Sequence, residues 1–591
     1  MQKKDIKFTL RDSNLPEEVK KEFNVYSELL GLLLYYRGIE TREKAEKFLK
    51  PDYYRDTHDP FLMKDMGKAV ERILKAIEQK EKIIIYSDYD ADGIPGAVVL
   101  HDFFKKINYE NFENYIPHRH DEGYGLNKEA IKKFSKNGAS LIITIDCGIS
   151  DSKEVKEAQK MGVDVIVTDH HIVGENLPPA FAVLNPKQKD CNYPDDVLAG
   201  AGVAFKLVQA LITKGSEGGL SSGSEADRGE ASGRTFLIKK GWEKWLLDMV
   251  GLATISDMVP LTDENRVFSY FGMQVLRKSP RYGLMHLLSH LKIDQKTLTE
   301  DDLSFMITPR INVASRIDNP DKAFRLLSTD DEVEAREMSL YLDTINAKRK
   351  TMVAVMVKEA IKKLKEREEK DLIVVGNPQW NPGLLGLIAN SLAEKYKKTA
   401  FVWGRGGDGS IKGSCRSCGI VDVFELMSSV EKGVFSDIGG HKMAGGFSVS
   451  KEGIHILEEK LLEVYKKDDN LNVDVNLVAD KKIFMDDVSW DTYKIVDQLA
   501  PFGTGNEKPL FFLEGVKIFN VKIFGKQNNH LGLDFRKKSG QIISAIKFFA
   551  DEISAGETSF KKGDKINILV NLEKSTFRNV NELRLRIVDF V

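Results

Sequence analysis

The chain has 591 residues, of which 42% are hydrophobic and 30% charged, and its formal net charge is −2. At roughly 150 residues per domain, this length predicts about four folded units with sizeable cores. The near-zero charge excludes a protein that is basic throughout. Any nucleic-acid site must therefore be a local basic groove.

The first part of the sequence predicts neither an export signal nor a membrane anchor. Met1–Leu10 alternates charged and apolar residues and lacks the apolar core of a signal peptide. The apolar run Leu29–Tyr36 is too short to span a bilayer. The four cysteines do not suggest a disulfide framework, and Cys415 and Cys418 lack the second ligand pair that a zinc site needs. We expect a cytoplasmic protein that does not bind membranes.

The first half of the chain is predicted to contain a helical segment and then a parallel sheet. Residues 1–60 are expected to be helical, with a break at Pro51. Across 61–329, short apolar strands alternate with amphipathic helices, a pattern typical of a doubly wound α/β domain that binds ligands at the carboxyl ends of its strands. The clearest elements are a helix at Lys68–Gln79, strands at Lys82–Tyr86, Ser140–Ile145 and Asp164–Thr168, and a helix at Asp151–Met161.

The second half is predicted to contain a long helix and two further domains. Residues 213–235 are rich in Gly, Ser and Glu and are expected to form a flexible insertion in the first domain. Residues 330–369 predict a connecting helix, and 370–472 a second α/β lobe. Residues 473–591 predict an OB-like barrel, a common binder of single strands. Its strands are expected at Val516–Phe524, Leu531–Phe535, Ile542–Phe549, Lys565–Leu572 and Leu583–Val588.

Acidic and imidazole side chains follow the predicted strands of the first domain. They are Asp88, Asp90 and Asp92, then Asp146, then Asp169, His170 and His171, with Asp257 after the apolar stretch Met249–Ile255. Parallel strands bring three or four such ends to one edge, so these groups should converge. Crowded carboxylates repel one another unless divalent cations compensate them. Mixed Asp and His ligands favour Mn²⁺ or Mg²⁺, and two such ions about 4 Å apart can activate a water against a phosphodiester.

Each of these groups also has a purely structural interpretation. An Asp-x-Asp after a strand is commonly a turn or a helix cap, and His170 and His171 alone could be ordinary surface or core residues. Asp146 alone could cap the helix that begins near Ser150. The four groups together, in register at strand ends, favour a metal centre.

The motifs resemble those of the DHH phosphoesterase superfamily and, within it, the RecJ family. The superfamily motifs are Asp88-Tyr89-Asp90-Ala91-Asp92-Gly93, Asp146-Cys147-Gly148, Asp169-His170-His171, Ile255-Ser256-Asp257-Met258-Val259-Pro260, and Gly439-Gly440-His441 followed by Ala444-Gly445-Gly446. The RecJ-like features are Glu122-Gly123-Tyr124-Gly125-Leu126, Pro309-Arg310-Ile311-Asn312 and Pro501-Phe502-Gly503-Thr504-Gly505-Asn506.

The resemblance implies a role for each matching residue. The implied metal ligands are Asp90, Asp92, Asp146, His170 and Asp257, with Asp88 and His171 as ligands or immediate supports. The implied substrate contacts are Arg119 and Tyr124 on the nucleotide path, Arg310, Ser414 and Arg416 around a 5′ phosphate, and His441 near the scissile bond.

The resemblance also implies the reaction and the partners. The implied enzyme uses two divalent ions, Mn²⁺ or Mg²⁺, to remove mononucleotides from the 5′ end of single-stranded DNA in repair and recombination. We expect a monomer whose protein partners are a single-strand-binding protein and a helicase. Aromatic residues of the barrel would help to hold the strand, although most are expected in its core: Phe512, Phe519, Phe524, Phe535, Phe548 and Phe549.

Three positions depart from the family pattern. Asn381 replaces a common His, Ser315 precedes Arg316 where Gly is usual, and Phe577 stands where Trp is frequent. These departures concern substrate contact and not the reaction. Two alternatives remain open: a phosphoesterase for very short oligonucleotides or cyclic dinucleotides, and a silent scaffold like the Cdc45 branch. The C-terminal β segment argues against the first, and the complete set of ligand positions argues against the second.

Overall fold

The computed structural model describes residues 8–216, 236–407, 409–419, 421–467, 477–525, 528–550, 553–554, 557–575 and 581–591. The expected insertion lies outside the described residues from position 217 onward, as does Phe577. The chain divides into two compact units, one formed by Tyr53–Asn472 and the other by Met1–Asp52 together with Val473–Val591. Among the described helices, none is both long and apolar enough to cross a membrane. All four cysteines are free.

The first lobe of the larger unit is a five-stranded, fully parallel sheet in the order β3-β2-β4-β5-β6. Its strands are β2 (Lys82–Ser87), β3 (Phe112–Tyr115), β4 (Ala139–Ile145), β5 (Asp164–Thr168) and β6 (Ala182–Leu184). The predicted parallel α/β domain is therefore confirmed. The sequence patterns missed β3 and β6, because these edge strands are short: β3 is only half-buried and β6 has three residues.

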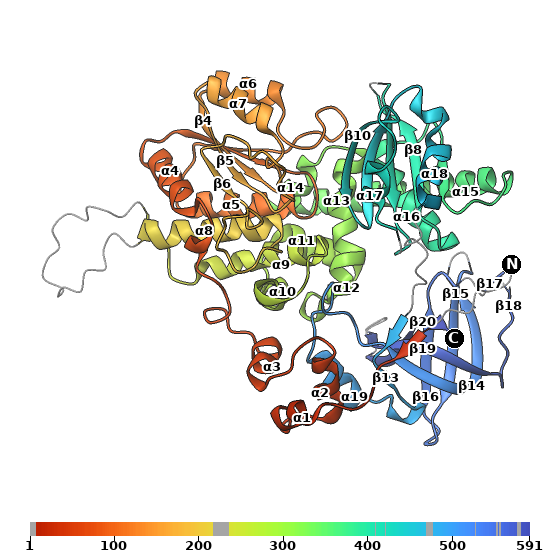
Figure 1. Cartoon of the computed structure of the whole chain (residues 1–591). Coiled ribbons are helices and arrows are strands. Elements are labelled where there is room, and N and C mark those ends of the chain that lie inside the picture. Colours follow the sequence, from red (N-terminus) through yellow and green to blue (C-terminus); the bar gives the residue numbers. More distant parts are fainter. Residues whose placement is uncertain are drawn as a thin grey trace, which may run out of the picture. The chain divides into compact units, whose positions relative to one another are not determined.

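Helices cover both faces of this sheet because its central strands are buried on both sides (Figure 1). One face packs against α4 (Met66–Glu78), α5 (Gly93–Lys106) and α8 (Gly200–Ser216), which contribute to the largest hydrophobic core. The other face packs against α6 (Lys128–Lys136) and α7 (Ser152–Lys160) in a separate core. The sheet edge at the strand carboxyl ends remains available for a site.

A group of helices connects the two lobes of the larger unit. In chain order they are η2 (Trp242–Leu246), α9 (Leu247–Ser256), α10 (Asp263–Leu276), α11 (Tyr282–Leu291), α12 (Glu300–Asp302), the π-helical turn η4 (Leu303–Ile307), α13 (Thr308–Ile317), α14 (Asp321–Ser328) and α15 (Glu332–Lys365). The 34-residue α15 confirms the predicted long helix. The stretch Met249–Ile255 lies within α9, so its residues form a helix and not a strand.

The second lobe is a five-stranded sheet in the order β10-β11-β9-β8-β7, in which only β7 and β8 are parallel. Its strands are β7 (Ile373–Gly376), β8 (Ala400–Arg405), β9 (Ile411–Arg416), β10 (Phe435–His441) and β11 (Ala444–Val449). Its helices are α16 (Leu385–Tyr396), α17 (Val423–Ser428) and α18 (Leu457–Lys467), with the short turn η5 (Pro382–Leu384) before α16.

The smaller unit contains a closed β-barrel that confirms the predicted OB-like fold. Its strands are β14 (Phe511–Phe524), β15 (His530–Arg536), β16 (Ile542–Lys547), β19 (Lys565–Ser575) and β20 (Glu582–Phe590). Pairing of β14 with β19 closes the barrel. Closure leaves no free edge among these strands.

The N-terminal helices share the hydrophobic core of this barrel. They are α1 (Glu17–Glu22), α2 (Glu28–Tyr35) and α3 (Arg42–Leu49). Leu33 and Leu34 of α2 are buried in the same core as Phe511 of β14. The Arg37 guanidinium also donates a 2.7 Å hydrogen bond to the Oδ1 atom of the buried Asn506. The two ends of the chain therefore build one unit.

Candidate metal centre and active site

The residues predicted from the strand ends meet at one edge of the first sheet. Asp88 follows β2, Asp146 follows β4, and the triplet that begins at Asp169 follows β5. These three strands are direct neighbours in the sheet. Asp257 comes from another direction, because it ends the helix α9. The expectation of a fourth strand end was therefore wrong, although the side chain still reaches the cluster.

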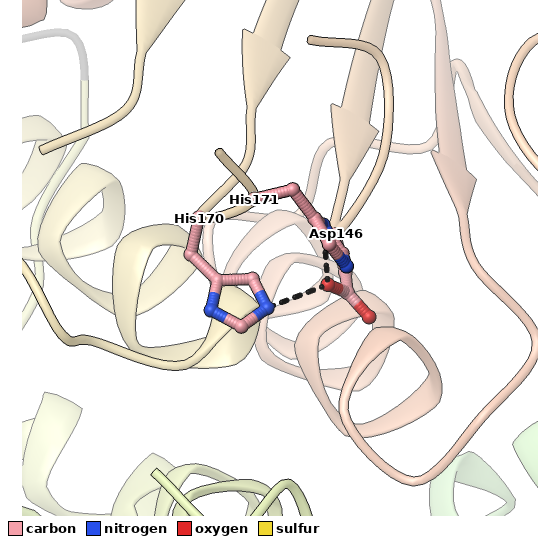
Figure 2. Close-up of side chains that lie close together, drawn as sticks. All are labelled: Asp146, His170 and His171. Carbon is pink, nitrogen blue, oxygen red and sulfur yellow. Dashed lines mark ion pairs between the residues drawn. The ribbon is translucent and has the colours of Figure 1, made fainter. Parts of the chain in front are cut away.

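Ligand atoms of these residues form three overlapping groups, each within 4.8 Å: Asp88, Asp90 and Asp146; Asp92, His170 and Asp257; and Asp146, His170 and His171. The Nε2 atom of His170 lies 3.2 Å from Asp146 Oδ1, 3.6 Å from Asp92 Oδ2 and 3.7 Å from Asp257 Oδ2. Figure 2 shows the two imidazoles beside the Asp146 carboxylate. Asp146 and His170 each belong to two of these groups. The sheet edge therefore offers enough ligand atoms for more than one cation.

Asp146 is held in a backbone conformation that few side chains adopt. Its φ is 59°, in the left-handed region, where Asp and Asn are more tolerated than other non-glycine residues. A Cβ atom on Gly200 would lie 2.6 Å from the Cβ of Asp146. Glycine at the start of α8 therefore allows this helix to approach the carboxylate closely.

Two carboxylates of the first motif are oriented by backbone amides. Asp90 Oδ1 accepts hydrogen bonds from the backbone N–H groups of Asp92 at 2.8 Å and Gly93 at 3.1 Å. Asp92 accepts from the N–H groups of Gly200 at 2.6 Å and Ala201 at 2.8 Å. Helix N-termini carry partial positive charge, so α5 and α8 stabilise these carboxylates as well as fix their direction.

Asp169, the first residue of the third motif, supports the centre without belonging to its three ligand groups. It is fully buried, and its Oδ1 accepts from the backbone N–H groups of His170 at 2.7 Å and His171 at 3.0 Å. The Nδ1 atom of His171 lies 2.7 Å from the same oxygen, and the N–H of Ile149 donates to Oδ2. Such hydrogen bonds orient an imidazole that ligates a metal.

The charges of the site fit divalent cations. Burial, together with the nearby carboxylates, raises the pKa of Asp92 to about 7 and that of Asp257 to about 8. The pKa values of Asp88 and Asp146 rise well above their usual range for the same reasons. Among the described residues, Asp88 Oδ1 is buried without a hydrogen-bond partner. Burial and the charge of His171 lower the pKa of His170 to about 3, which favours the neutral imidazole that binds metals.

A pocket of about 260 Å³ adjoins the carboxylates. It is lined by the first motif, by the segment that follows β3 and by α13, through Asp88, Tyr89, Asp90, Arg119, Tyr124, Asn312, Ser315 and Arg316. Arg119 lies over the Tyr89 ring, 5.0 Å from its centroid. Tyr124 donates to the Asp146 carbonyl at 3.0 Å, so its ring is held between the pocket and the metal edge. The two expected nucleotide-path residues therefore lie beside the carboxylates.

Arg316 is a pocket residue to which the sequence assigned no role. Its Nη1 donates to the Gly383 carbonyl of η5 at 3.1 Å, which links the first lobe to the second. Burial, together with the charges of Arg119, Arg349 and Arg416, lowers the pKa of Arg316 to about 9. A half-buried arginine among other arginines indicates an anion site. The available signal was the family's Gly-Arg pair, in which Arg316 keeps the arginine and Ser315 replaces the glycine.

The residues expected around a 5′ phosphate are only partly brought together. Arg416 donates from Nη1 to Ser414 Oγ at 3.2 Å, and both lie on β9. Arg310 has other partners: its Nε and Nη2 donate to Asp343 Oδ1 at 2.8 and 2.6 Å, and its Nη1 donates to the Met306 carbonyl at 2.5 Å. Arg310 also does not line the pocket. Its contacts are those of a residue that fixes η4 and α15.

His441 ends β10 of the second lobe, as the glycine-rich motif suggested. Burial lowers the pKa of its imidazole, and the positive charges of Arg416 and His171 also lower it. The side chain is thus in electrostatic range of both the β9 residues and the third motif, which lie on different lobes.

The aromatic residues of the barrel are less buried than expected. Only Phe512 and Phe535 of the six belong to the buried set, and Phe549 is 74% exposed. The expectation that most of them lie in the core was therefore wrong. The ring of His530 lies 4.9 Å from Phe549, 5.1 Å from Phe548 and 5.3 Å from Phe524, centroid to centroid. Arg586 lies 4.2 Å from the Phe548 centroid.

Three family models match the chain in the order of its domains. They are described as "DHH family, N-terminal domain" at residues 82–227, "DHHA1 domain" at 350–467 and "RecJ OB domain" at 479–589. These matches cover both lobes of the larger unit and the barrel.

Curated relatives are similar over most of the chain. The single-stranded-DNA-specific exonuclease RecJ of Bacillus subtilis is 34% identical over 567 residues, which cover 95% of this chain and 67% of the relative. The protein of the same name from Escherichia coli is 31% identical and covers 82% of both chains.

Solved structures of similar proteins have the same fold. The RecJ of Thermus thermophilus, solved with Mn²⁺, has a TM-score of 0.79 at 23% identity, covering 100% of this chain and 80% of that one. An exonuclease RecJ bound to manganese has a TM-score of 0.55 at 28% identity, covering 70% of this chain and 98% of that one.

Proposed function

The chain belongs to the RecJ family of single-stranded-DNA-specific exonucleases, and from this premise we propose that it removes mononucleotides from the 5′ end of single-stranded DNA. It is a metal-dependent nuclease with the DHH fold. The observation that carries the proposal is the convergence of three overlapping ligand groups next to a pocket lined by arginine.

The residues that would hold two divalent ions are Asp88, Asp90, Asp92, Asp146, His170 and Asp257, with His171 as a ligand or a support. When bound, Mn²⁺ or Mg²⁺ supplies charge compensation at the phosphodiester and lowers the pKa of water. The protein's own part is to fix the carboxylates by backbone amides, to keep His170 neutral and to hold His171 through Asp169. His441 would approach the scissile bond from the second lobe.

The pocket beside this centre would hold the terminal phosphate. We assign the phosphate to Arg316 and Arg119 from the first lobe and its connecting helix, and to Ser414 and Arg416 from β9. Planar guanidinium groups present paired donors to phosphate oxygens. Arg310 is left out, because Asp343 already occupies its guanidinium. Tyr124 and Tyr89 would border the adjacent sugar or base.

The barrel would hold the rest of the strand. In OB folds, the loop between the first two strands borders the binding face, and His530 begins β15 directly after that loop. Phe549 has a φ of 52° and an exposed ring, an unfavourable arrangement that suits a surface that binds a ligand. Bases stack on such rings with little regard to sequence, and Arg586 adds a cation for the backbone.

The remaining features of the proposal rest on family membership alone. The enzyme would act as a monomer in the cytoplasm, in DNA repair and recombination. Its protein partners would be a single-strand-binding protein and a helicase.

The decisive experiment compares 5′-labelled and 3′-labelled copies of one DNA strand in the presence of Mn²⁺. A 5′ label should appear at once as a mononucleotide, whereas a 3′ label should remain on a shortening strand. The matching blunt duplex should resist. Early release of the 3′ label, or equal cutting of strand and duplex, would refute the proposed polarity or strand choice.

A further inference from the structure

Four arginines beside the metal edge lack an acidic partner in the part of the chain that the structure describes. Arg119, Arg316, Arg349 and Arg416 form no ion pair with a carboxylate among those residues. The Nε of Arg349 is also buried there without a hydrogen-bond partner. Burial is the largest cause of the lowered pKa of Arg316, and the positive charges of Arg119, Arg349 and Arg416 each lower it further. Half-buried cations without carboxylate partners are costly, so such a group indicates a site for anions.

The position of Arg349 follows from the packing of two helices. Arg310, near the start of α13, bonds to Asp343 on α15. Ile317, which ends α13, packs in one core with Met352 and Val353 of α15. The two helices therefore run side by side in the same direction, and Arg316 and Arg349 lie at corresponding levels. Arg349 thus adds a further positive charge close to Arg316.

The charge behind the pocket exceeds what a single phosphate requires. Asp343 is the acidic partner in this region and is already shared by Arg310 at 2.6 Å and His290 at 2.9 Å. Lys350 follows Arg349 on α15. Partial burial lowers the pKa of Lys350, and the positive charges of Arg310 and Arg349 lower it further. A terminal monophosphate carries about −1.5 to −2 charges, whereas each further phosphate adds more.

We propose that the pocket continues from Arg316 to Arg349 and Lys350 and accepts the second and third phosphates of a 5′-triphosphorylated strand. This inference rests on the proposed 5′-end function. The first phosphate would stay on Arg119, Arg316 and Arg416, so the reacting phosphodiester keeps its place at the carboxylates. A DNA strand with such an end would then be a substrate without prior trimming.

The reaction is the same hydrolysis with a different first product. The oxygen of water bonds to the phosphorus between the first and second nucleotides, and the bond from that phosphorus to the 3′ oxygen breaks. The 3′ oxygen takes up a proton and leaves on a nucleoside triphosphate. The shortened strand keeps a 5′ monophosphate, so every later product is a mononucleotide.

The test uses the full-length protein with Mn²⁺ and two DNA oligonucleotides of one sequence, one 5′-monophosphorylated and one 5′-triphosphorylated. Mass spectrometry of the first product should show a nucleoside triphosphate from the second substrate. Arg349→Gln should lower kcat/KM for the triphosphate by about tenfold, the effect of one charge-assisted contact, and leave the monophosphate nearly unchanged. Arg349→Lys should restore part of the loss, which a mere folding defect would not allow.

Lys348→Gln is the matched control, because it removes one exposed positive charge from the neighbouring position of α15. It should affect neither substrate. If the wild type cleaves the monophosphate but not the triphosphate, or if Arg349→Gln slows both equally, the extended site does not exist. Failure of the wild type on both substrates would instead refute the proposed function, and this inference with it.

Discussion

The metal edge and the phosphate pocket differ in how the chain assembles them. The metal edge draws its residues from the ends of three neighbouring parallel strands, together with the end of α9. The pocket is lined by a loop that carries Arg119 and a helix that carries Arg316, and Arg416 on a strand of the second lobe acts on Arg316 through its charge. Sheet topology by itself brings together the strand-end residues of the metal edge, whereas the phosphate site depends on how the two lobes pack. A site can thus be predicted from the sequence when one parallel sheet sets the positions of its residues.

The largest expected effect is at the metal edge. Asp146→Asn should leave the fold intact, because Asn also tolerates the left-handed conformation that Asp146 adopts. The lost charge weakens the hold on the cations and removes several kcal/mol of transition-state stabilisation, so kcat should fall by about a thousandfold or more. The measurement is single-turnover hydrolysis with saturating Mn²⁺, with circular dichroism to confirm folding.

Asp169→Asn sharpens this test, because Asp169 supports His171 instead of joining a ligand group. The loss should be smaller, about ten- to a hundredfold, as is usual for partners that orient a ligand. Equal losses in the two variants would mean that Asp169 is itself part of the ligand set. Activity of Asp146→Asn within a few-fold of wild type would remove the metal assignment altogether.

The second prediction separates Arg316 from Arg310. Arg316→Gln should reduce kcat/KM on 5′-phosphorylated ends by about ten- to a hundredfold, since each charge-assisted contact is worth roughly 1.5–3 kcal/mol. Ends with a 5′ hydroxyl should lose much less. Arg310→Gln should instead lower Tm, because it removes the guanidinium from Asp343 and leaves that carboxylate with His290, and it should slow both substrates alike.

Paired kinetics on 5′-phosphate and 5′-hydroxyl oligonucleotides decide between these roles. Arg416→Gln should behave like Arg316→Gln, because we assign both guanidinium groups to the same phosphate from different lobes. A selective loss of 5′-phosphate use in Arg310→Gln, with no loss in Arg316→Gln, would restore the original sequence-based assignment and refute the structural one.

The sequence predicted the elements that periodicity controls and missed those that packing controls. Buried strands such as Lys82–Ser87 and the long helix Glu332–Lys365 have clear patterns, and the observed bounds agree closely with the expected ones. The apolar stretch before Asp257 has no period that distinguishes a buried helix from a strand, so its type was wrong. The partial burial of Arg316 depends on its contact with η5 of the other lobe, which no local pattern reveals.

The smallest expected effect is on the barrel, where each base contact contributes little and the contacts act together. Phe549→Ala removes an exposed ring that packs edge-on against His530, so Tm should change little. Loss of one stacked base should weaken binding of a long single strand by about 1–2 kcal/mol, roughly tenfold. Binding by fluorescence anisotropy, with Ca²⁺ in place of Mn²⁺ to prevent cutting, measures this directly.

Phe484→Ala is the control for that measurement, because Phe484 is 69% exposed in the same unit but belongs to no aromatic cluster among the described residues. It should bind long strands as the wild type does. Hydrolysis of an oligonucleotide of a few residues should be the same in both variants and the wild type, because neither substitution alters the metal edge. If Phe549→Ala binds a long strand as tightly as Phe484→Ala does, the aromatic cluster around His530 is not a strand-holding surface, and the phosphate contacts of the larger unit must account for the affinity.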